Sequence, residues 1–112
     1  MLTAVWGWLV AFFFTQLFEM PIYWKATGSL RVAFLASAMT HPVVWFVFPV
    51  SMDHGVGYGP MVALAEIFAV LAEAAWLRFN GISAGKALLW SLAANAFSAT
   101  CGFLLREWVG FP

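Results

Sequence analysis

Charged residues are scarce in this sequence, and their scarcity argues against a soluble protein. Only 9% of the 112 residues are Asp, Glu, Lys or Arg, whereas 64% are hydrophobic. A soluble domain of average composition has about a quarter of its residues charged, because charge covers its water-facing surface. The five basic and five acidic residues also cancel, so no net charge would attract nucleic acid. We therefore expect an integral membrane protein in contact with the lipid bilayer.

Cysteine and the motifs of common hydrolases are also lacking. Cys101 is the one cysteine, which excludes an intramolecular disulfide framework and a Cys-rich metal site. The sequence has no Ser/His pairing and no HExxH motif. An intramembrane enzyme with Glu73 or Glu66 as general base is therefore the least supported function, and we do not expect an enzyme.

Four apolar runs are long enough to cross a bilayer, which takes about 20 helical residues. We expect helices at approximately 1–24, 31–52, 56–78 and 86–106. The connections between them are short and rich in glycine, so they leave no room for a domain outside the membrane. The predicted fold is an all-α bundle of four transmembrane helices that forms a single domain, 1–112.

The basic residues are biased toward two of the three connections. Lys25 and Arg31 flank the first connection and Arg78 and Lys86 flank the third, whereas the segment 53–60 has neither Lys nor Arg. The positive-inside rule then makes the first and third connections cytoplasmic. We expect the protein to lie in the inner (cytoplasmic) membrane of a bacterium, with both termini on the outer side. Aromatic residues fall at both predicted interfaces: Trp6, Trp8, Tyr58 and Trp108 outside, and Tyr23, Trp24 and Trp76 inside.

Several polar side chains lie inside or at the edge of the predicted spans: Glu19, His41, Glu66, Glu73 and Asn95. A charged group at the centre of a membrane helix costs about 2.5–3.5 kcal/mol, so such residues normally face the bundle interior and mark functional sites. Glu66 and Glu73 are seven residues apart and therefore share one helix face.

The other predicted helices carry small or polar residues at matching spacings: Thr15 and Glu19; Ala33, Ser37 and His41; and Ala87, Ser91, Asn95, Ser98 and Gly102. Such seams let membrane helices approach closely. A rise of 1.5 Å per residue from the cytoplasmic ends places His41, Glu66 and Asn95 in a middle layer roughly 14–20 Å deep. Glu19 and Glu73 form an inner layer roughly 8–9 Å deep. Two carboxylates in a dry layer would share a proton or bind a cation.

Pro42 interrupts the second predicted helix in mid-membrane. It has no N–H group, so it releases the carbonyl of Ala38 and kinks the helix beside Thr40 and His41. Such kinks flank ion sites in transporters but also serve plain packing. The predicted binding residues are Glu66, Glu73, His41, Asn95, Glu19 and Thr40.

The favoured function is a small transport protein whose buried cluster binds a proton or a divalent metal cation. Carboxylate and imidazole ligands suit zinc, so His41, Glu66 and Glu73 are the candidate metal ligands. The alternative is an accessory or cofactor-binding subunit of a larger membrane complex, in which His41 is an axial ligand to a haem or chlorophyll-type pigment. The sequence also leaves open whether the protein forms a homo-oligomer.

One stretch of the chain resembles a known family. The four-span layout, with Glu19 followed by Lys25-Ala26-Thr27-Gly28, is similar to the small multidrug resistance transporters, where one helix-1 glutamate exchanges protons for lipophilic cations. The resemblance covers about a dozen residues. The chain departs from that family in its additional intramembrane Glu66, Glu73 and His41, and its biased loops argue against the family's dual topology. It is therefore not assigned to that family.

Overall fold

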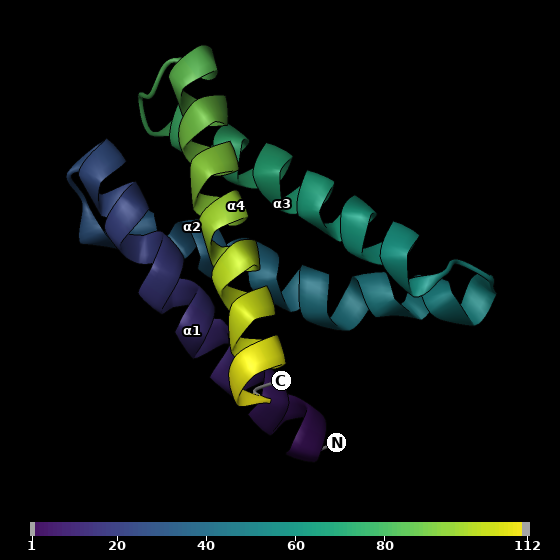
Figure 1. Ribbon diagram of the computed structural model, residues 1–112. Coiled ribbons are helices and arrows are strands. Elements are labelled where there is room, and N and C mark those ends of the chain that lie inside the picture. Colours follow the sequence, from purple (N-terminus) through teal and green to yellow (C-terminus); the bar gives the residue numbers. More distant parts are fainter. Residues whose placement is uncertain (1, 111–112) are drawn as a thin grey trace.

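The computed structural model describes residues 2–110, which form an antiparallel arrangement of four helical segments (Figure 1). In chain order, the elements are α1 (Leu2–Thr27), α2 (Leu30–Pro42), η1 (Val43–Val47), η2 (Phe48–His54), α3 (Tyr58–Phe79) and α4 (Ala84–Val109). α1 packs against α2 and α4, and α3 packs against α4 and α2. The predicted all-helical architecture is confirmed within this range.

All four segments have the length and apolarity of membrane spans. They cover Thr3–Thr27, Leu30–His54, Tyr58–Phe79 and Ala84–Trp108. Large apolar side chains such as Phe13, Leu17, Leu71 and Phe103 are exposed on their outward faces. Apolar outward faces of this extent suit a hydrocarbon solvent rather than water. By length and composition, the helices therefore suggest a membrane location.

The sequence predicted one continuous helix over 31–52, but the second span is not one continuous α-helix. Regular α-helix ends at Pro42, five π-helical residues follow in η1, and η2 completes the span as a 3-10 helix. Pro42 cannot donate the backbone hydrogen bond that would continue the α pattern, and the π-helical residues begin directly after it. The break lies where the proline predicted it, and it extends over the whole second half of the span.

The two ends of the molecule differ in how tightly they pack. The end that carries the connections 28–29 and 80–83 is named here the loop end, and the end that carries both termini and the segment 55–57 is named the splayed end. α3 and α4 lie side by side at the loop end and diverge toward the splayed end (Figure 1). At the loop end, Gly28 ends α1 with a φ of 72°, and the Ser29 hydroxyl caps α2 by accepting from the Val32 N–H at 3.2 Å.

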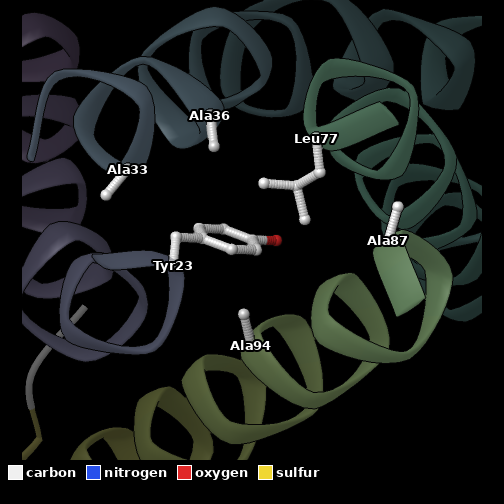
Figure 2. Close-up of a cluster of buried hydrophobic side chains, with 6 residues drawn as sticks. All are labelled: Tyr23, Ala33, Ala36, Leu77, Ala87 and Ala94. Carbon is white, nitrogen blue, oxygen red and sulfur yellow. The ribbon is translucent and has the colours of Figure 1, made fainter. Parts of the chain in front are cut away.

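A compact core fills the loop end. The Tyr23 ring lies at its centre, and Leu77 approaches from α3 (Figure 2). Alanines from α2 and α4 surround the ring: Ala33, Ala36, Ala87 and Ala94. Their small side chains let the helices come close together. This core positions the polar site that lies beside it.

Candidate functional site

The Glu73 carboxyl is the point where all four helices meet. Its side chain is only 2% exposed. Oε1 accepts from the Tyr23 hydroxyl of α1 at 2.5 Å and from Asn95 Nδ2 of α4 at 3.0 Å. Oε2 accepts from the Thr40 hydroxyl of α2 at 2.5 Å. A carboxyl of α3 thus ties together the other three helices through three donors.

The Glu19 carboxyl lies beside this point and is buried to the same degree, at 2% exposed. Oε1 accepts from the Ser37 hydroxyl of α2 at 2.6 Å, and Oε2 accepts from the Ser98 hydroxyl of α4. Glu19 and Glu73 line the same small cavity. We call these two residues the carboxyl pair. Within residues 2–110, neither member forms a salt bridge with Lys or Arg.

Hydroxyl groups surround the carboxyl pair, and three of them have a second acceptor within reach. The Tyr23 hydroxyl lies 3.4 Å from Ser91 Oγ. The Thr40 hydroxyl lies 3.4 Å from the carbonyl oxygens of both Ala36 and Ser37, and Ser98 Oγ lies 3.3 Å from the carbonyl oxygen of Asn95. A hydroxyl can donate or accept. Each of the three can therefore serve a charged carboxylate, or turn its proton elsewhere and accept from a neutral one.

Tyr23 was expected in the interfacial aromatic belt, and this expectation was wrong. Its side chain is 0% exposed, and its hydroxyl reaches Glu73. Tyr23 follows Glu19 by four residues, which places both side chains on one helix face. That spacing was the available signal, and it outweighs the general preference of tyrosine for interfaces. Ser37 and Ser98 lay on the predicted seams, but their role as donors to Glu19 required the structure.

A small polar cavity lies next to the carboxyl pair. Its volume is about 130 Å³. The candidate residues Glu19, Thr40, His41, Glu66, Glu73 and Asn95 all line it, together with Thr15, Val44, Ala69, Ser98 and Ala99. A polar cavity of this size has room for water, because one water molecule needs only about 10–15 Å³ of such volume. The structure therefore brings all six predicted binding residues to one cavity.

The expected middle layer of His41, Glu66 and Asn95 does not form as a bonded group. Asn95 donates to Glu73 and so belongs with the inner carboxyls. Depth counted along separate helices ignores their tilt and the lean of the side chains. Glu66 and His41 line the cavity without a hydrogen bond to each other.

His41 lies in an aromatic surrounding. Its ring lies 5.5 Å from that of Phe12, 6.4 Å from that of Trp8 and 6.3 Å from that of Trp45, measured between centroids. Its Nδ1 atom is buried and has no hydrogen-bond partner. In the part of the chain from 2 to 110, no group of three or more His, Cys, Asp or Glu residues is arranged to hold a metal ion. The predicted ligands His41, Glu66 and Glu73 thus share a cavity without forming a metal centre.

Comparisons with protein-family models, with curated proteins and with solved structures find no match to this chain. The short resemblance to the small multidrug resistance transporters therefore does not indicate a function for this chain. The functional argument depends on the geometry of the carboxyl pair and its cavity.

Proposed function

We propose that this protein is a small proton transporter, and that the carboxyl pair of Glu19 and Glu73 is its proton-binding site. The observation that carries the proposal is that two buried carboxyl groups line one small cavity and have no basic partner within residues 2–110. Two such groups cannot both be charged cheaply in a low-dielectric interior, so a proton shared between them is the simplest balance.

The surrounding donors favour a proton over a divalent metal. Each of the four carboxylate oxygens accepts from at least one side chain: Tyr23 and Asn95, Thr40, Ser37, and Ser98. A metal ion would have to displace these donors and replace their hydrogen bonds with coordination bonds. When a carboxylate oxygen gains a proton, the hydroxyl that donated to it only has to accept from it instead. Tyr23, Thr40 and Ser98 can do so, because each has a second acceptor for its own proton.

Proton flux into liposomes tests this function. The purified protein is reconstituted into vesicles that contain a pH-sensitive dye, and a potassium diffusion potential drives protons inward. We expect flux above that of protein-free vesicles, and we expect Glu19→Gln and Glu73→Gln to reduce it to the protein-free rate. Glutamine keeps the shape of the side chain but cannot carry the exchangeable proton.

Asp53→Asn is the matched control, because Asp53 is an exposed carboxylate in the last turn of η2, at the end of the second span. This variant should retain the flux of the parent protein. A parent protein whose flux equals that of empty vesicles would contradict the proposal. Full flux in both glutamine variants would contradict it equally.

A further inference from the structure

Glu66 lies where three cavities meet. It lines the polar cavity of about 130 Å³ that reaches the carboxyl pair. It also lines two larger clefts at the splayed end, one of about 580 Å³ beside η1 and η2 and one of about 610 Å³ beside α4. Glu66 is half-buried, whereas Glu73 is buried. Its carboxyl therefore separates the interior site from the open end of the molecule.

Polar side chains lie at the rim of both clefts, whereas the rest of the cleft beside η1 and η2 is mostly apolar. Tyr58 and Arg106 line both clefts, and Arg106 Nη1 donates to the Tyr58 hydroxyl at 3.2 Å across the divergence of α3 and α4. Glu107 lines the cleft beside α4. Arg106 and Glu107 lie in the last turn of α4, where water solvates charged side chains better than lipid tails do.

The loop end offers no comparable route. Tyr23, Leu77, Ala33 and Ala87 lie between the carboxyl pair and the connections of that end, and each is at most 1% exposed. The Tyr23 ring and the Leu77 side chain point toward each other in the space between the helices (Figure 2). Apart from the Tyr23 hydroxyl, which donates to Glu73, these four core residues have apolar side chains with no group that could pass a proton.

We infer that the splayed end is a water-filled vestibule, and that Glu66 relays protons between this vestibule and the carboxyl pair. A hydronium ion in the vestibule transfers its proton to a carboxylate oxygen of Glu66 and becomes water. Glu66 then passes the proton through water in the inner cavity to a carboxylate oxygen of Glu73 and regains its charge. The relay rests on the proposed function, whereas the vestibule does not. In the part of the chain from 2 to 110, the two clefts lead to Glu66 from the splayed end, which is the kind of one-sided access that alternating-access transporters use.

Cysteine accessibility tests the vestibule independently of proton transport. In a Cys101→Ser background, Val62→Cys places a thiol in both clefts, and Leu64→Cys places one two residues away on the same helix, where it lines neither cleft. Ala99→Cys is a second vestibule position, on α4. The thiolate of the introduced cysteine attacks a charged, membrane-impermeant thiol reagent. Both the thiolate and the reagent need water, so we expect roughly tenfold faster labelling at positions 62 and 99 than at 64. Equal rates at all three positions would overturn the vestibule.

The exchange rate of the carboxyl pair tests the relay. After a rapid pH jump, infrared absorption follows protonation of the pair in the parent protein and in Glu66→Gln. We expect exchange in Glu66→Gln to be roughly tenfold slower when the two proteins are compared at the same fractional protonation of the pair, because the variant lacks the group that passes the proton. Parent-like exchange under that condition would overturn the relay. If no carboxyl pair titrates in the parent protein, the proposed function is contradicted, and the relay is contradicted with it. The labelling result would still decide whether the vestibule exists.

Discussion

The Tyr23 hydroxyl donates to Oε1 of Glu73 at 2.5 Å, and this bond joins two helices through the centre of the molecule. Both side chains are almost completely buried. The ring of Tyr23 belongs to the apolar core at the loop end, while its hydroxyl belongs to the polar site. Tyr23 therefore connects the apolar core at the loop end to the polar site around Glu73.

Tyr23→Phe should lower the stability of the bundle. The variant keeps the ring in the core but leaves Glu73 Oε1 without its shortest donor. An interhelical hydrogen bond in a membrane protein contributes about 0.6 kcal/mol on average. A buried carboxyl that loses a donor should cost more, about 1–3 kcal/mol. Helix loss during denaturation in mixed micelles, followed by circular dichroism, measures the change.

Tyr58→Phe is the matched control for this substitution. Its hydroxyl accepts from Arg106 at the exposed splayed end, so the free energy of unfolding should change by no more than about 0.5 kcal/mol. Equal stability of the Tyr23→Phe and Tyr58→Phe variants would show that the buried bond does not hold the helices together.

Thr40 and His41 are neighbours in the chain and should respond differently to substitution. Thr40→Val removes a 2.5 Å hydrogen bond to Glu73 and should cost about 1–3 kcal/mol of stability. His41→Phe removes a buried Nδ1 atom that has no partner and keeps a ring among aromatic neighbours, so its effect should stay within about 0.5 kcal/mol. The same denaturation measurement compares the two. A larger loss for His41→Phe would indicate that the imidazole, and not the carboxyl pair, organises the site.

The orientation in the membrane can be tested with two matched glycines. Gly59 and Gly85 have no neighbour within 4 Å of an added Cβ atom and have no positive φ. In the Cys101→Ser background, Gly59→Cys should react with an impermeant reagent on the same side of the membrane as Thr3→Cys, and Gly85→Cys on the opposite side. The positive-inside rule predicts that Gly85→Cys is cytoplasmic. Labelling of positions 59 and 85 from one side would contradict the transmembrane arrangement.

Hydropathy and spacing predicted much of this structure. Four long apolar helical segments, their approximate ends and the burial of Glu19, Glu73 and Asn95 all followed from the cost of polar groups in hydrocarbon and from helical periodicity. The same reasoning misplaced Tyr23, because it treated aromatic residues as a class and not by their helix face.

The sequence did not predict the hydrogen-bond partner of each polar group. Ser37 and Ser98 both lay on predicted seams, yet which carboxyl they serve depends on how the helices are rotated and tilted. The π-helical segment after Pro42 is a second example. A proline predicts an interruption, but the length of the irregular segment depends on packing against α3 and on the second proline, Pro49.

Infrared difference spectroscopy of the carboxyl pair tests the central claim most directly. Spectra of the purified protein recorded at high and low pH report the carboxyl groups that gain a proton. If Glu19 and Glu73 share one proton, the same protonated-carboxyl band should disappear in Glu19→Gln and in Glu73→Gln, because the proton belongs to the pair and not to either residue. The band should remain in Asp53→Asn. Difference spectra of Glu19→Gln and Glu73→Gln that match the parent spectrum would contradict a shared proton at this site.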